Sequence, residues 1–186
     1  MKLTRPRVEP VSMEEYLRHP HPGTPRALAS SAVNLSRTWM RFPALMAARA
    51  ALGRHLLGPD ASLPRREREL GIMRMGVLRR CDYELVQHRI FNLEDHVLTE
   101  DEMQRLVIGP DAAGWSDLDA ALLRAVDEMH QDAFISEATW TALSSAWSSE
   151  QLMDFIVLAG QYWTVATMLN CVGVQLEPGK EPFLDV

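Results

Sequence analysis

The amino-acid sequence predicts an all-α protein, and three observations support this class. Between Pro64 and Gly173 the only proline is Pro110, and the region is rich in Ala, Leu, Met, Glu and Arg, most of which favour helices. No segment alternates apolar and polar residues with the period of two that half-buried strands show. Three hydroxyl residues each stand three positions before an acid or an amide, a pattern typical of helix starts. The 186 residues suffice for one domain with a sizeable core.

The chain divides into an arm, a helical domain and a tail. Residues 1–26 hold five of the 11 prolines, and this arm should be extended or irregular because proline lacks a backbone donor and restrains the preceding residue. Residues 27–176 form the helical domain, and 177–186 a C-terminal tail. The expected helices lie near 27–41, 43–57, 64–79, 82–96, 99–107, 116–131, 136–146 and 148–172.

Several helix ends are marked by specific residues. Thr99 and Ser148 begin capping boxes, since Glu or Gln follows three positions later, whereas Ser116 is followed by a less favourable Asp. Gly173 suits a C-terminal cap. The helix expected over 148–172 is apolar around most of its circumference, so we expect it to be central or buried between subunits.

Composition excludes several classes of function. Nineteen basic against 25 acidic residues give a net charge of −6, which argues against nucleic-acid binding. Charged or polar residues interrupt the apolar stretches, so no membrane-spanning helix is expected, and no secretory signal is visible. The two cysteines, Cys81 and Cys171, cannot form a disulfide framework and suit a reducing compartment. The sequence therefore predicts a cytoplasmic protein.

Residues 65–80 form the most highly charged stretch, with six arginines and two glutamates. Such a run is typical of a solvated or inter-subunit face. It also supplies cations that could hold a substrate carboxylate, and Arg80, next to Cys81, is the first candidate.

The next stretch carries the candidate chemistry. On the helix that Asp82 opens, Glu84 and His88 are four residues apart and lie on one face. A carboxylate beside an imidazole can orient it for proton transfer, and a helix start favours a thiolate at Cys81. The other interpretation, a surface ion pair beside a buried structural cysteine, stays open. His88 and His96 are eight residues apart, about 12 Å along a helix, so no metal site is expected.

This stretch resembles the carboxymuconolactone decarboxylase family, which includes the alkyl hydroperoxidase D-like proteins. The peroxidase motif of that family is Glu, eleven residues, Cys, two residues, Cys, three residues, His. Glu69, Cys81 and His88 match it, but Glu84 stands at the second cysteine. The similarity extends over roughly residues 27–176.

The resemblance implies an alkyl hydroperoxidase D-like bundle of about seven to eight helices that forms homo-oligomers, commonly trimers or hexamers, without a cofactor. It also implies that Glu69 relays protons to Cys81 or His88. The last helix would then lie beside the helix of His88. Tyr162 and Trp163, together with Tyr83 and Arg80, are therefore candidates for contact with a small-molecule substrate.

Three functions are compatible with this resemblance. A Glu four residues before a His is similar to the decarboxylase branch, which implies acid–base chemistry, of the decarboxylation or isomerisation type, on a small organic acid or lactone. A thiol-dependent peroxidase is the alternative, although Glu84 cannot resolve an oxidised Cys81 by forming a disulfide. The third hypothesis is an inactive member that serves in ligand binding or assembly.

Overall fold

The computed structural model describes residues 3–18 and 33–184, and all regular secondary structure in these ranges is helical, which confirms the predicted class. The helices are α1 (Met13–Arg18), α3 (Asn34–Trp39), α4 (Pro43–Leu57), α5 (Arg65–Leu78), α6 (Asp82–Glu94), α7 (Glu100–Ile108), α8 (Asp117–Asp132), α9 (Glu137–Ser144) and α10 (Ser149–Val172).

The first part of the chain differs from the prediction in one respect. The arm is not irregular throughout, because residues 13–18 form α1. The Ser12 hydroxyl accepts a hydrogen bond from the Glu15 amide at the start of this short helix, and Tyr16 packs with Val11 and Met40. Of the helix expected over 27–41, the structure describes α3, while residues 27–32 lie outside the described part.

The predicted helix caps are present. The Thr99 and Ser148 side chains each accept from the third residue of their helix, whose side chain returns a bond to the capping backbone amide. Ser116 caps α8 through the Asp119 amide alone, because the shorter Asp side chain does not complete the box. Gly173 ends α10 in the left-handed conformation, with a φ of 74°, which glycine adopts without strain.

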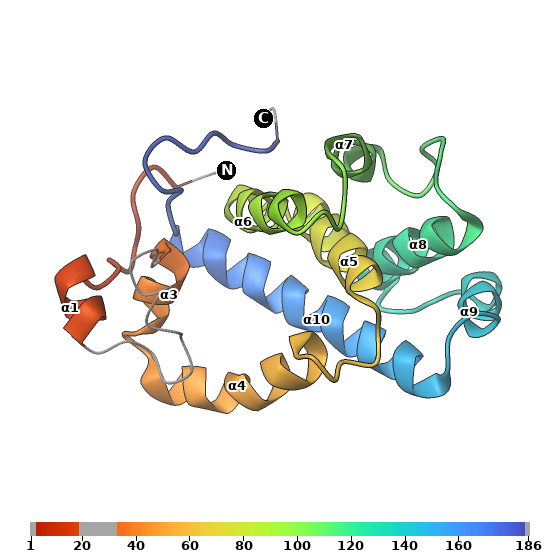
Figure 1. The fold of residues 1–186 in the computed structure, drawn as a ribbon, viewed down its shortest axis with the longest axis horizontal. Helices are drawn as coiled ribbons and strands as arrows, with labels where there is room; N and C mark the ends of the chain where they lie inside the picture. Colours follow the sequence, from red (N-terminus) through yellow and green to blue (C-terminus); the bar gives the residue numbers. More distant parts are fainter. Residues whose placement is uncertain (1–2, 19–32, 185–186) are drawn as a thin grey trace.

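Helix α5 lies at the centre of the domain and packs against α6, α7, α8 and α10 (Figure 1). The charge run over residues 65–80, expected to form a solvated or inter-subunit face, departs from that expectation at two positions: six of its eight charged side chains are exposed or half-buried, but Glu69 and Arg74 are buried. The buried residues of α5 include Leu70, Ile72 and Met73 but also Glu69 and Arg74. The charge run is compatible with burial because the buried charges have partners.

Arg74 makes the most extensive of these contacts. Its guanidinium binds Asp127 of α8 through two hydrogen bonds of 2.6 and 2.7 Å, and donates to the Leu106 carbonyl of α7 at 2.6 Å. A Cβ at Gly109 would lie 2.6 Å from the guanidinium, at a φ of 110°. The Gly109 turn thus leaves space for Arg74, and this arginine joins α5, α7 and α8.

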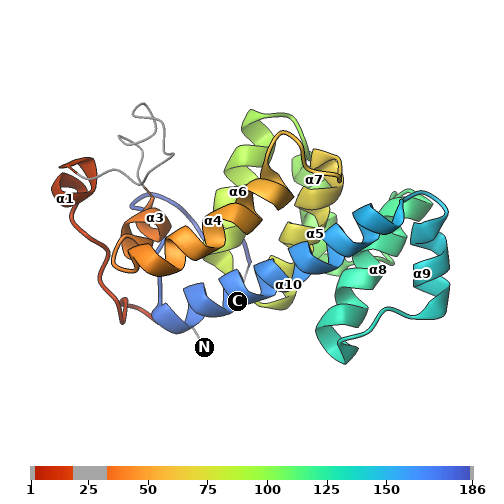
Figure 2. The ribbon, with the colours of Figure 1, turned by 90° about the horizontal axis from the view of Figure 1, so that it is seen from below.

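Helix α10 runs along most of the length of the molecule (Figure 2), and in the view of Figure 1 it lies between α4 on one side and α5 and α6 on the other. It approaches α5 closely, since a Cβ at Gly71 would lie 3.0 Å from the Phe155 ring. Within the described residues, α10 is the one helix long and apolar enough to cross a membrane by length and composition. Its buried side chains, among them Phe155, Leu158 and Leu169, pack inside the domain, as those of a core helix do.

The C-terminal segment packs back onto the body of the domain. Glu177 accepts hydrogen bonds from the Asn34 amide and the Tyr83 hydroxyl, both 2.8 Å long, and from the Gln87 amide at 2.7 Å. The Asp82 carboxylate accepts from the backbone amides of residues 183 and 184. The segment therefore fastens α3 to the start of α6.

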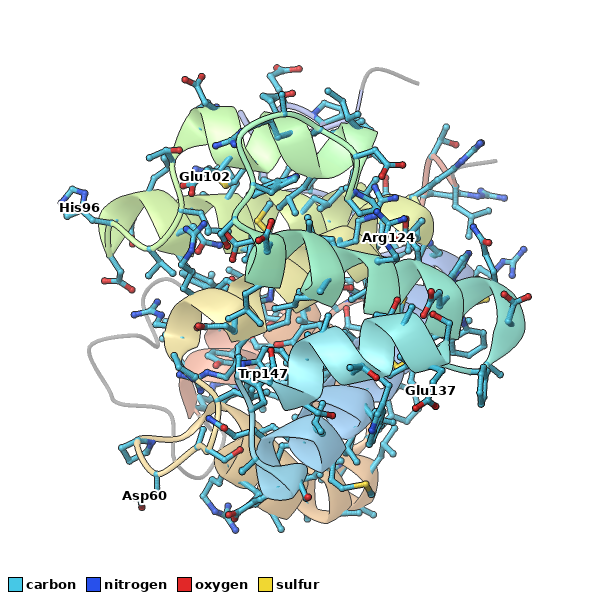
Figure 3. The ribbon with its side chains drawn as sticks, turned by 90° about the vertical axis from the view of Figure 1, so that its right-hand side faces the viewer. Asp60, His96, Glu102, Arg124, Glu137 and Trp147 are labelled. Carbon is cyan, nitrogen blue, oxygen red and sulfur yellow. The ribbon has the colours of Figure 1, made fainter. Side chains whose placement is uncertain are left out.

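Replacing Arg74 tests the importance of the buried ion pair. Arg74→Met leaves Asp127 without its partner, and we expect the free energy of unfolding, measured by urea denaturation, to fall by about 3 kcal/mol. Arg124→Met is the control, because Arg124 pairs with Asp111 on the outer face of α8 (Figure 3); this change should cost less than about 1 kcal/mol. Equal losses in the two variants would contradict the role of Arg74.

Candidate functional site

A cavity of about 350 Å³ lies among α3, α4, α6 and α10. Most of its wall is apolar, and the polar side chains that reach it come mainly from α6 and α10. The lining residues are Val33, Leu35, Trp39, Met46, Arg49, Ala50, Gly53, Leu56, Leu57, Tyr83, Glu84, Gln87, His88, Phe91, Gln161, Tyr162, Val165 and Leu169. Pockets between packed helices are common ligand sites.

His88 of α6 and Glu69 of α5 form the central pair of the site. His88 Nδ1 lies 2.8 Å from Glu69 Oε2, and the Asn92 amide donates to the same oxygen at 2.8 Å. Burial alone would raise the pKa of Glu69, but the bonds from His88 and Asn92 outweigh it, and the pKa lies below the ordinary value. Glu69 is therefore ionised, so Nδ1 carries the proton that it shares with Glu69. In neutral His88, Nε2 is then the basic nitrogen.

Glu84 does not form the predicted pair with His88. Its carboxyl oxygens are buried and have no hydrogen-bond partner within the described part of the chain. Burial, followed by repulsion from Glu69, raises the pKa of Glu84 well above its ordinary value. The spacing of four residues places Glu84 and His88 on one face of α6. Glu69 of the neighbouring helix α5, however, is the group that binds His88 Nδ1. Burial therefore favours the neutral acid form of Glu84.

Two residues of the site escaped the sequence analysis. Asn92 follows His88 by four residues, and this spacing was an available signal. Arg49 interrupts the Ala- and Leu-rich helix α4 on the face that carries Met46 and Gly53, and it reaches the cavity. Its guanidinium lies 5.1 Å from the centre of the Trp39 ring. No local pattern in the sequence indicates that α4 lies near α6.

Tyr83 and Tyr162 both reach the cavity, as predicted, but in different ways. The Tyr83 hydroxyl donates to Glu177 and accepts from the Leu35 amide, so it holds α3 in place. Tyr162 is buried, and its ring stands edge-on to the His88 ring with centroids 5.4 Å apart. It therefore restricts the orientation of the imidazole.

Arg80 and Trp163 do not reach this cavity. Arg80 is exposed and has a left-handed backbone, with a φ of 49°, and it lines a separate depression beside the C-terminal segment. Trp163 is 41% exposed on another face of α10, where the Arg79 guanidinium covers its ring at 4.5 Å. Arg80 and Trp163 are next to Cys81 and Tyr162 in the sequence. This adjacency does not predict where their side chains point, since neighbouring residues of a helix point to different sides.

Cys81 precedes α6 as predicted, but its side chain is fully buried. It packs against Tyr83, Val165 and Leu169 and is absent from the cavity wall. The position at the helix start therefore does not bring the thiol to the surface of the site.

Among the residues that the structure describes, no group of three or more His, Cys, Asp and Glu side chains is arranged to hold a metal ion.

The comparisons with known proteins agree with this architecture. The model of the carboxymuconolactone decarboxylase family matches residues 43–128, the segment from α4 to α8 that supplies Glu69, His88 and Arg49. This match confirms the family resemblance that the sequence predicts. No curated protein matches the chain.

Solved structures with the same fold come from several bacteria. An alkylhydroperoxidase AhpD core protein of Ralstonia eutropha has a TM-score of 0.76 at 16% identity, covering 93% of both chains. A peroxidase-related protein of a Silicibacter species has a TM-score of 0.62 at 19% identity, covering 95% of this chain and 91% of its own. A protein of unknown function from Agrobacterium tumefaciens gives 0.68 at 18% identity, covering 75% and 94%. The fold is thus AhpD-like, as predicted.

The neutral state of Glu84 has a measurable consequence for stability. The pKa of Glu84 is raised in the folded protein, so the folded state keeps this proton above about pH 4.3, the approximate pKa of an unfolded glutamate. The contribution of Glu84 to stability is therefore lost as pH rises from about 4.3 towards the folded pKa. Glu84→Gln has no proton to lose. Relative to this variant, wild type should therefore lose up to about 1.4 kcal/mol per pH unit above pH 4.3, measured by urea denaturation at several pH values.

The matched control is Glu94→Gln, at the exposed end of the same helix. The difference in the free energy of unfolding between Glu94→Gln and wild type should not grow with pH in the way expected for Glu84→Gln. A difference between wild type and Glu84→Gln that is constant from pH 4 to pH 8 would contradict the neutral buried acid.

Proposed function

We propose that this protein is a cofactor-independent enzyme that performs acid–base chemistry, of the decarboxylation or isomerisation type, on a small organic acid or lactone. The observation that carries the proposal is the 2.8 Å contact between Glu69 and His88 Nδ1, made by an imidazole that lines a cavity of about 350 Å³. An oriented imidazole beside a substrate-sized space is the usual arrangement for proton transfer.

In this proposal His88 Nε2 removes or returns a proton at the carbon next to a substrate carbonyl. Glu69 stabilises the imidazolium that forms and fixes the ring, and Asn92 fixes Glu69. Tyr162 packs against the ring edge and leaves the imidazole little freedom to rotate. Arg49 replaces Arg80 as the cation that holds the substrate carboxylate, since Arg49 lines the cavity.

The other two hypotheses have less support. A thiol peroxidase requires a peroxide to reach Cys81, whose side chain is 0% exposed, and reactive cysteines are partly exposed. An inactive member that serves in ligand binding or assembly does not require an imidazole oriented by a carboxylate at the cavity, and the Glu69–His88 pair is present there.

We also propose that the protein is a cytoplasmic homo-oligomer, a trimer or a hexamer. Met153 and Val157 of α10 are 57% and 38% exposed and lie one turn apart on the same face of the helix. Leu45 and Leu57 of α4 are also exposed. Exposed apolar side chains of this kind are typical of subunit contacts.

Replacing His88 tests the proposed function. Lactone acids and keto acids are incubated with the protein in D₂O, and NMR follows loss of carbon dioxide and uptake of deuterium next to the carbonyl. We expect turnover by wild type and a loss of at least 100-fold in His88→Gln, because general acid–base catalysis contributes about 10²–10⁴-fold, with the helical circular dichroism unchanged.

Two control variants make this experiment specific. His96→Gln changes a histidine that points outward beyond the end of α6 (Figure 3), and it should leave turnover unchanged. Cys81→Ser should also retain activity. If Cys81→Ser abolished turnover, or if peroxide oxidised Cys81 quickly and an external thiol restored it, the thiol chemistry would replace the proposed function.

The oligomeric state is tested by light scattering. Wild type should have three or six times the monomer mass of 21.0 kDa, and Met153→Glu should shift the population towards smaller species because it places a charge in an apolar contact. Thr141→Glu, at an exposed polar position of α9, is the control and should not. A wild type of 21.0 kDa would refute the proposal.

A further inference from the structure

Arg49 is the one arginine or lysine among the described residues that line the cavity. No hydrogen bond or ion pair joins its guanidinium to a carboxylate of the described residues; the guanidinium lies over the Trp39 ring instead. Burial lowers the pKa of Arg49, against a smaller opposing effect of Tyr162, but a guanidinium stays charged under any ordinary condition. A partly buried cation without an anionic partner is costly, and a bound anion would remove this cost.

Apart from Gln161 of α10, whose amide is neutral, the remaining polar groups of the wall offer little to a second charge. The Tyr83 hydroxyl and the Gln87 amide already donate to Glu177. Burial raises the pKa of Glu84, and Glu69 behind His88 is negative. An anion at the His88 end would therefore meet a carboxylate rather than a cation.

The space between Arg49 and the other helices is apolar. Met46 and Leu57 line it from α4, and Val165 and Leu169 from α10. The volume of about 350 Å³ is at the small end of the range for small-molecule pockets, about 300–1,000 Å³. A ligand that fills this space must bring an apolar body with its charge.

We propose that the cavity selects an amphipathic monocarboxylate, with its carboxylate on Arg49 and its apolar body between α4 and α10. This inference deepens the proposed function, because it names the substrate class of the same site. A guanidinium binds a carboxylate through two parallel hydrogen bonds, while the apolar wall gains from burial of a hydrocarbon body. A dicarboxylate would bury a second charge without a partner, at considerable cost.

Three probes of similar length separate these contributions: octanoate, 1-octanol and octanedioate. Their binding is measured by isothermal titration calorimetry at pH 8. Wild type should bind octanoate at least tenfold more tightly than either of the other two, since a hydrogen bond to a charged group contributes more than one to a neutral group. Equal affinity for octanoate and 1-octanol, or tighter binding of octanedioate, would overturn the proposal without any variant.

The variants locate the carboxylate. Arg49→Gln should lose at least tenfold in octanoate affinity and little in 1-octanol affinity, whereas Arg49→Lys should retain part of the preference because it keeps the charge. Arg54→Gln removes an exposed arginine of the same helix and should bind octanoate as wild type does. Unchanged octanoate binding by folded Arg49→Gln would overturn the assignment.

His88→Gln separates this inference from the proposed function. It should keep the preference for octanoate over 1-octanol, since Arg49 rather than His88 holds the head group; loss of the preference in His88→Gln would overturn the inference. If octanoate binding follows these expectations but no organic acid is turned over, the proposed chemistry fails and the ligand class stands.

Discussion

The architecture depends on the pairing of charges on a buried helix. Helix α5 is enclosed by four other helices, yet it carries Glu69 and Arg74 among its buried residues. Unpaired charges there would cost more than the domain can tolerate, so each is matched by a partner from another helix. Asp127 places α8, and His88 with Asn92 places α6. The same requirement that stabilises the fold therefore also assembles the Glu69–His88 pair.

The environments of the two site carboxyl groups differ, and this difference defines the electrostatics. Glu69 receives two hydrogen bonds and stays ionised, while Glu84 receives none from the described residues and stays neutral. The site thus holds one negative charge beside the imidazole rather than two. Neighbouring carboxyl groups with divergent pKa values are a common feature of acid–base sites. Glu84 stands where the peroxidase motif has its second cysteine. Cys81, at the position of the first cysteine, is buried in the core.

Helices α3 and α4 form one side of the cavity. They contribute Trp39 and Arg49 to a wall that α6 and α10 alone would leave open, and Glu177 fastens the start of α3 to Tyr83. The proposed ligand class rests on one cation, Arg49, in a cavity wall that is mostly apolar. The fold itself is shared with AhpD-like proteins, but a fold does not specify a reaction, and the chemistry is argued from these side chains.

The sequence by itself determined the all-α class, most helix boundaries, the capping residues and the family resemblance, because caps and helical periodicity depend on residues close in the chain. It also singled out Glu69, His88 and Tyr162. The tertiary structure decided which groups meet: Glu69 rather than Glu84 binds His88, Arg49 rather than Arg80 reaches the cavity, and two charges of α5, Glu69 and Arg74, are buried. These contacts join different helices, and local spacing carries no information on how helices pack against one another.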